Sequence, residues 1–131
     1  MTTKRVLVID DEDGVREIIQ FSLEAVAGWE VLPAASGSEG IDIAQSQQPD
    51  AILLDVMMPD LDGPATFQQL QANTTTHHIP TIFLTAKVRT SEQQQLLDLG
   101  VSGTIAKPFK AQELVEQIRA ILHWDEWGAR G

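Results

Sequence analysis

The chain has 131 residues, 43% of them hydrophobic, and its 19 acidic and 9 basic residues give a formal net charge of −10. This size predicts a single domain, while no apolar run is long enough to span a membrane and the lack of cysteine excludes disulfides and thiolate metal sites. The acidic balance argues against a nucleic-acid partner, whose phosphates it would repel, and because no signal peptide is visible we expect a cytoplasmic protein.

Apolar, β-branched segments recur along the chain and alternate with helical patterns. They lack the polar–apolar alternation of a half-exposed strand, which indicates strands buried on both faces. The five predicted strands cover residues 5–9, 30–33, 51–54, 81–84 and 103–106.

A helix is predicted after each of these strands, and the first and last have apolar residues at helical spacing. We expect those residues to form the faces that pack on the sheet. They are Val15, Ile18, Ile19, Leu23 and Val26 in the first helix, and Leu114, Val115, Ile118, Ile121 and Leu122 in the last.

Capping signals mark where several of these helices begin and end. A serine or threonine followed three residues later by glutamate or glutamine satisfies free amides at a helix start, proline suits a first turn, and glycine often ends a helix. The signals are Ser36 with Glu39, Thr90 with Gln93, Pro64 in a first turn, and Gly28 and Gly100 at helix ends.

Five strand–helix repeats predict an α/β fold. Right-handed crossovers between parallel strands place helices on both faces of the sheet, so we expect a doubly wound, five-stranded parallel sheet. In such folds ligands bind beyond the carboxyl ends of the strands, at the topological switch point.

Four of the predicted strands are followed by residues that can take part in chemistry. Asp10 and Asp11 follow the first strand, Asp55 the third, Thr85 the fourth and Lys107 the fifth. These side chains are expected to meet at one edge of the sheet. Three neighbouring carboxylates repel one another and stay ionised only if a cation compensates them. Oxygen ligands without histidine or cysteine favour Mg²⁺.

This set of groups predicts phosphoryl transfer. Asp55 can attack phosphorus as a carboxylate nucleophile and form an acyl phosphate. Mg²⁺ and the Lys107 ammonium would neutralise the phosphoryl oxygens, and the Thr85 hydroxyl would donate a hydrogen bond to one of them. The small Ala86, directly after Thr85, would leave the site accessible.

Taken singly, these residues have simpler interpretations. Asp10 and Asp11 could cap the first helix, where acids suit the helix dipole. Thr85 could be a strand-end hydroxyl and Lys107 a surface lysine. The edge that they share is what favours a site.

Other polar and aromatic residues are assigned structural places. Asp60 and Asp62 are interpreted as turn residues before Gly63. His77 and His78 fall in a polar stretch without partner ligands, so solvated loop positions are expected. For Trp124 and Trp127 in the tail, packing is favoured over a partner surface.

Four motifs occur in order along the chain: VLVIDDE with Asp10 and Asp11, LLDVMMPDLDG with Asp55, FLTAK with Thr85, and GVSGTIAKPF with Lys107. By these motifs the chain resembles the receiver domain of bacterial response regulators, the family of the chemotaxis protein CheY, with its flavodoxin-like (βα)5 fold. The resemblance covers residues 4–123. Residues 124–131 are interpreted as a C-terminal tail without an output domain.

The resemblance implies roles for individual residues. Asp11 would bind Mg²⁺ directly and Asp10 largely through water, with Asp55 and the backbone carbonyl of Met57 completing the protein ligands. The bond between Lys107 and Pro108 is expected to be cis, aiming the amine inward.

The resemblance also implies a function, that of a single-domain response regulator in two-component signal transduction. A histidine kinase or phosphotransfer protein would phosphorylate Asp55, shifting an equilibrium between two conformers. The fourth helix, fifth strand and fifth helix would bind a downstream protein, and the chain would be a monomer or a phosphorylation-linked dimer. It would be a switch rather than an enzyme.

Three positions bear on how such a switch would work. Thr104 stands where many receivers have a tyrosine or phenylalanine that moves inward on activation, which puts coupling to Thr85 through an aromatic rotamer in question. Met57 and Lys87 occupy positions that influence phosphoryl lifetime in receivers.

Three other classes of protein are compatible with parts of the pattern. A haloacid-dehalogenase-type phosphatase would need a second acid at Met57, in an Asp-x-Asp motif after an early strand. A flavodoxin-like cofactor binder would need a phosphate-binding first loop, where Asp10 and Asp11 would repel the phosphate. A scaffold that is never phosphorylated would not need the acid–threonine–lysine set.

Overall fold

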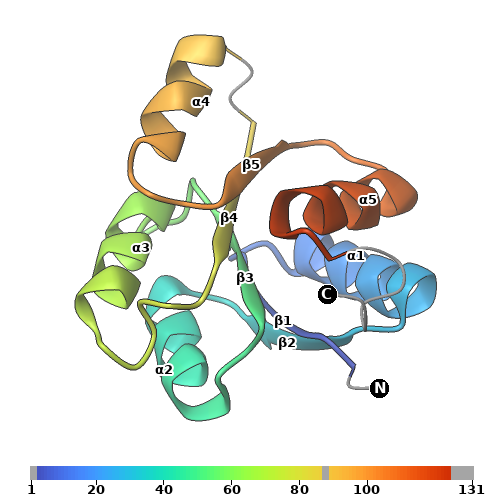
Figure 1. Ribbon diagram of the computed structural model, residues 1–131, viewed down its shortest axis with the longest axis horizontal. Coiled ribbons are helices and arrows are strands. Elements are labelled where there is room, and N and C mark those ends of the chain that lie inside the picture. The colour runs from blue at the N-terminus through green and yellow to red at the C-terminus, as the bar shows by residue number, and fades with distance from the viewer. Residues whose placement is uncertain (1–2, 87–88, 125–131) are drawn as a thin grey trace.

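A computed structural model of the chain describes residues 3–86 and 89–124 (Figure 1). Strands and helices alternate throughout this part of the chain. The strands are β1 (Arg5–Ile9), β2 (Glu30–Ala34), β3 (Ala51–Asp55), β4 (Thr81–Thr85) and β5 (Gly103–Ala106). The helices are α1 (Asp13–Ser22), continued by the π-helical segment η1 (Leu23–Ala27), then α2 (Gly37–Gln47), α3 (Gly63–Ala72), α4 (Thr90–Leu97) and α5 (Ala111–Leu122).

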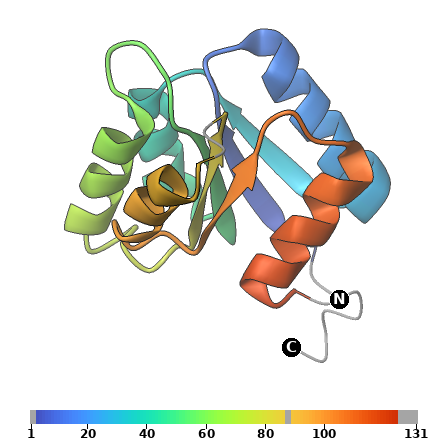
Figure 2. The same cartoon turned by 90° about the horizontal axis from the view of Figure 1, so that it is seen from above.

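The five strands form one parallel sheet in the order β2-β1-β3-β4-β5. Helices α1 and α5 cover one face, and α2, α3 and α4 cover the other (Figures 1 and 2). The predicted doubly wound α/β fold is therefore confirmed. The strand order reverses between β1 and β3, so the topological switch point lies where Asp10 and Asp55 end their strands.

The sheet separates two hydrophobic clusters. In β1, Val6 and Val8 belong to the cluster under α1 and α5, while Leu7 and Ile9 belong to the cluster on the opposite face. Successive side chains of a strand point to opposite faces, so a strand buried on both faces needs apolar residues throughout. This explains why the strands read as continuous apolar runs.

Most of the predicted helix signals are confirmed. The Ser36 hydroxyl accepts a hydrogen bond of 3.1 Å from the Glu39 amide at the start of α2. Pro64 lies in the first turn of α3, and Gly28, with φ +72°, ends the π-helical segment. The bond between Lys107 and Pro108 is cis, as the resemblance implied.

The predicted buried face of the first helix is wrong at two positions. Ile19 and Leu23 are fully buried, but Ile18 is 60% exposed and Val26 is 40% exposed. The helix buries only a narrow stripe, and Ile18 lies about 100° around the helix from Ile19. Val26 belongs to the π-helical segment, whose wider turn changes the helical register on which the prediction relied.

The predicted ends of the fourth helix also need correction. Arg89, not Thr90, stands at the N-cap, and Thr90 is already helical. At the other end α4 stops at Leu97, before Gly100, which has φ +107°. Propensity signals place a helix end only to within a residue or two.

Trp124 packs against the body of the domain, as expected. Its ring meets that of Trp29 edge-to-face at 5.3 Å, and the Lys4 ammonium lies 4.8 Å from the Trp124 ring centroid. Trp127 lies outside the described residues. Within the described chain, no helix combines the length and apolar character needed to cross a membrane.

Gly63 connects the end of β3 to the start of α3. Its amide donates a hydrogen bond of 2.9 Å to the Val56 carbonyl oxygen. A Cβ atom at this position would lie 2.5 Å from the Asp55 carbonyl oxygen and 2.7 Å from the Val56 Cα. Both are backbone atoms, so a side chain here would push β3 and α3 apart.

We therefore expect Gly63→Ala to lower the free energy of unfolding by about 1–3 kcal/mol, the usual cost of overpacking a tight site. Gly14→Ala is the matched control, because a Cβ there meets nothing within 4 Å and alanine favours a helix by up to about 1 kcal/mol. Urea denaturation measures both. Equal stability of the two variants would contradict this close approach.

Candidate functional site

Asp10, Asp11 and Asp55 come together at the carboxyl edge of the sheet. One carboxylate oxygen from each lies within 4.8 Å of the others. Asp10 is fully buried and Asp55 is 4% exposed, whereas Asp11 is more accessible. The structure thus brings together the three acids that the sequence placed on one edge.

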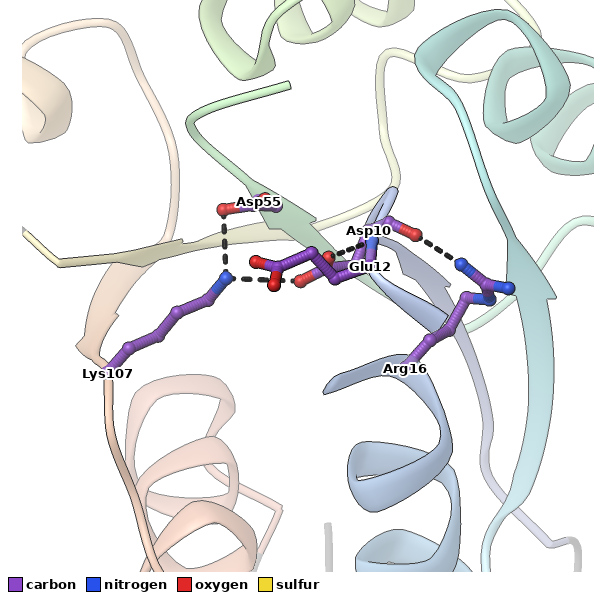
Figure 3. Close-up of polar contacts among 5 residues, drawn as sticks. All are labelled: Asp10, Glu12, Arg16, Asp55 and Lys107. Atoms are coloured by element: carbon purple, nitrogen blue, oxygen red, sulfur yellow. Dashed lines mark hydrogen bonds and ion pairs between the residues drawn. The ribbon is translucent and has the colours of Figure 1, made fainter. Parts of the chain in front are cut away.

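Lys107 joins two of these acids from the end of β5. Its Nζ atom lies 3.1 Å from Asp10 Oδ2 and 3.1 Å from Asp55 Oδ1 (Figure 3). The Lys107 backbone amide donates to the Thr85 carbonyl oxygen at 2.8 Å, which ties the lysine to the end of β4. The predicted convergence of Lys107 on Asp10 and Asp55 is confirmed.

The electrostatics of Asp55 and Lys107 are coupled. Burial raises the pKa of Asp55, and the negative charge of Asp10 raises it further. The hydrogen bonds from Lys107 and from the Met57 amide lower it. The pKa of Asp55 nevertheless lies above its ordinary value. For Lys107, burial lowers the pKa, but the hydrogen bond to Asp55 and the charges of Asp10 and Asp55 outweigh it, so its pKa is raised.

The donor set fits a hard divalent cation. Three carboxyl groups face one ammonium group, so the four side chains together can present net negative charge to a cation. The converging ligands are oxygens, which suit Mg²⁺ better than softer metals. Asp10 and Asp55 would contribute from the buried side and Asp11 from the exposed side.

The other residues singled out in the sequence lie at strand ends, in strands or in loops. Thr85 is the last residue of β4 and is buried, and Ala86 after it is exposed. Met57 is 70% exposed in the loop after β3. Thr104 lies within β5 beside Phe83 of β4. Lys87 lies outside the described residues.

Residues that the sequence analysis assigned to loops and turns stay apart from the acids. The Asp62 carboxylate accepts from the Ala65 amide and caps α3, and Asp60 adopts a positive φ of 65° in the same loop. His77 and His78 are exposed between α3 and β4.

Glu12 and Arg16 also contact Asp10, although the sequence pattern predicted no role for either residue. The Glu12 backbone amide donates to Asp10 Oδ1 at 2.9 Å, and the Arg16 guanidinium donates to the Asp10 carbonyl oxygen at 2.7 Å (Figure 3). Side-chain spacing gave no signal for the Arg16 contact, because its acceptor is a backbone carbonyl.

The part of the chain that carries these site residues is similar to known proteins. A family model described as the response regulator receiver domain matches residues 6–119. The chain is 42% identical over 118 residues to Response regulator MprA of Mycolicibacterium vanbaalenii, an alignment that covers 90% of this chain and 50% of MprA. The chain spans about half the length of the curated relatives it matches.

Solved structures share the fold over nearly the whole chain. A response regulator from Chloroflexus aurantiacus has 33% identity and a TM-score of 0.85, covering 93% of this chain and 99% of its own. The receiver domain of the sensor histidine kinase PA1611 of Pseudomonas aeruginosa, with a magnesium ion in its active-site cleft, has 28% identity and a TM-score of 0.82, covering 93% and 99%.

The raised pKa of Asp55 gives a test of the site's electrostatics. The folded-state pKa lies above the ordinary 3.8, so the contribution of Asp55 to stability is fully present below pH 3.8 and is lost as pH rises through the folded pKa. Without divalent cations, we therefore expect Asp55→Asn to unfold at a higher urea concentration than the wild type at neutral pH. The difference should shrink as the pH falls toward 3.8.

Asp42→Asn is the control, because Asp42 is an exposed acid on α2. It should shift the midpoint much less at any pH. A lower midpoint for Asp55→Asn at neutral pH would show that the carboxylate stabilises the site without a metal.

Proposed function

The chain belongs to the response regulator receiver domain family of two-component signalling, and from this premise we propose that it is a switch that accepts a phosphoryl group on Asp55 in a Mg²⁺-dependent reaction. The observation that carries the proposal is the Lys107 ammonium held 3.1 Å from carboxylate oxygens of both Asp10 and Asp55. This arrangement places a cation beside the nucleophile where phosphoryl oxygens would gather.

The proposed reaction is an in-line displacement. A carboxylate oxygen of Asp55 forms a bond to phosphorus, and the bond from phosphorus to the donor breaks, with its electron pair leaving on the donor. Lys107 neutralises charge on the transferred group, and Thr85 donates a hydrogen bond to one of its oxygens. Bound at Asp10, Asp11, Asp55 and the Met57 carbonyl, Mg²⁺ would supply charge compensation and orient the phosphoryl group.

In this proposal phosphorylation switches the binding of a partner protein. The chain does not act as an enzyme on a separate substrate. A histidine kinase or phosphotransfer protein is the proposed donor, in the cytoplasm. The output face is α4–β5–α5. Leu97 at the end of α4 is 37% exposed, and Leu99 in the turn after α4 is 40% exposed. Because Thr104 stands where many receivers have an aromatic residue, this face would respond without an aromatic rotamer change at that position.

The proposed functional unit is the receiver domain at residues 4–123. Its acidic charge of −10 makes direct nucleic-acid binding unfavourable. Residues 125–131 of the proposed tail lie outside the described structure. A monomer or a phosphorylation-linked dimer is compatible with this function.

The phosphoacceptor is tested with acetyl phosphate and Mg²⁺, which remove the need for a protein donor. Intact-mass measurement should show the wild type gaining one phosphoryl group, and Asp55→Asn gaining none. Asp60→Asn is the matched control, since Asp60 is an exposed aspartate in the following loop, and it should be labelled like the wild type. Equal labelling of Asp55→Asn and the wild type would rule out Asp55 as the acceptor.

The role of Lys107 gives a second prediction. Lys107→Ala should slow labelling by acetyl phosphate on the order of a hundredfold, because a preorganised charge at the phosphoryl oxygens is lost. The same change should not weaken Mg²⁺ binding, since it removes a positive charge from beside the acids. Wild-type labelling rates in Lys107→Ala at saturating Mg²⁺ would contradict the proposed role.

A further inference from the structure

Arg16 extends from the first turns of α1 to Asp10, on the side opposite Lys107 (Figure 3). One guanidinium nitrogen donates a hydrogen bond of 2.7 Å to the Asp10 backbone carbonyl oxygen, and another pairs with the Asp13 carboxylate. The Arg16 side chain is 16% exposed and that of Asp13 is 83% exposed. Arg16 is therefore packed into the loop between β1 and α1, while its acidic partner is solvated.

The carbonyl that Arg16 binds belongs to the peptide group joining Asp10 to Asp11. The other polar groups of Asp10 are also held: its amide donates to the Ala34 carbonyl oxygen at 3.1 Å, Oδ1 accepts from the Glu12 amide at 2.9 Å, and Oδ2 accepts from Lys107 at 3.1 Å. The Arg16 bond fixes the orientation of the peptide that follows. A change of ψ at Asp10 would reorient this peptide and, with it, the backbone of Asp11, whose carboxylate lies within 4.8 Å of those of Asp10 and Asp55.

We propose that Arg16 is a positioning residue for the divalent cation, acting through the peptide between Asp10 and Asp11. The inference rests on the proposed function, because it assumes that these acids bind Mg²⁺. The planar guanidinium suits the task, since it binds the carbonyl and the Asp13 carboxylate at once. It touches neither the phosphoryl group nor the metal.

Charge and geometry predict opposite effects of removing Arg16. A positive charge near three carboxylates repels a cation, so on charge alone its removal should tighten Mg²⁺ binding. If Arg16 instead holds the acids in their binding geometry, its removal should weaken binding. Groups that orient metal ligands typically change metal affinity by about 10–100-fold when they are lost. The sign of the change therefore distinguishes the two roles.

The experiment titrates the full chain with Mg²⁺ and follows backbone amide resonances by NMR. Arg16→Met should weaken Mg²⁺ binding about tenfold. Arg16→Lys, which keeps the positive charge and one donor nitrogen, should recover part of the lost Mg²⁺ affinity. Arg89→Met is the matched control, because it removes the same charge from an exposed position at the start of α4, and its affinity should stay within about twofold of the wild type.

A second readout uses the metal-free protein. In Arg16→Met the Glu12 amide, which donates to Asp10, should exchange with solvent faster than in the wild type, while amides of β3 should exchange at the wild-type rate. This pattern indicates a loosened loop in an intact domain. If Arg16→Met does not fold, Arg16→Lys decides the question, and an affinity equal to that of the wild type would overturn the proposal.

Unchanged or tighter Mg²⁺ binding by Arg16→Met would also overturn the positioning role while leaving the proposed function intact. If the wild type itself bound no Mg²⁺, the proposed function would fail first. Asp11→Asn should lose the Mg²⁺ binding that the wild type shows, which confirms that the titration reports on the acidic site. The two failures are thus distinguishable within one set of titrations.

Discussion

The ammonium group of Lys107 joins the ends of strands that are far apart in the sequence. It lies within hydrogen-bonding distance of Asp10 at the end of β1 and of Asp55 at the end of β3, and its own backbone amide binds the end of β4. One positive charge among three acids leaves a net negative site that attracts a divalent cation. The metal, the acceptor and the phosphoryl group would all be organised around this contact.

The fold makes this concentration of charge tolerable. Apolar residues cover both faces of the sheet, so the polar groups gather at its carboxyl edge, where Asp11 is accessible to water. Gly63 lets α3 start directly against the backbone of Asp55, and Arg16 holds the loop before α1. The hydrophobic clusters on both faces therefore offset the stability that is lost by burying Asp10 and Asp55.

The sequence predicted the architecture well because the strands are buried on both faces. Runs such as residues 51–54 admit few other interpretations, and β1 and β5 have the predicted bounds. The outer surface of α1 could not be predicted in the same way. Ile18 and Ile19 are equally apolar, and only the packing of the helix on the sheet, with the π-helical turn after it, decides which one is buried.

The site was predictable at the level of residue types and strand ends, and the contacts of Lys107 followed from the topology. The contacts of Arg16 did not follow, because a hydrogen bond to a backbone carbonyl has no signature in side-chain spacing. Asp13 lies two residues after Asp11 in the sequence and looks like another candidate ligand, yet it pairs with Arg16 and is exposed. The direction in which each side chain points in the folded protein therefore decides which acids converge on the site.

The most direct measurement is chemical identification of the acceptor. An acyl phosphate is reduced by borohydride to an alcohol, so a phosphorylated aspartate becomes homoserine, which peptide mass spectrometry can locate after digestion. After treatment with acetyl phosphate and Mg²⁺, homoserine is predicted at position 55, with Asp10 and Asp11 unchanged. Homoserine at position 10 or 11, or phosphorylated protein with no homoserine at position 55, would contradict the role of Asp55.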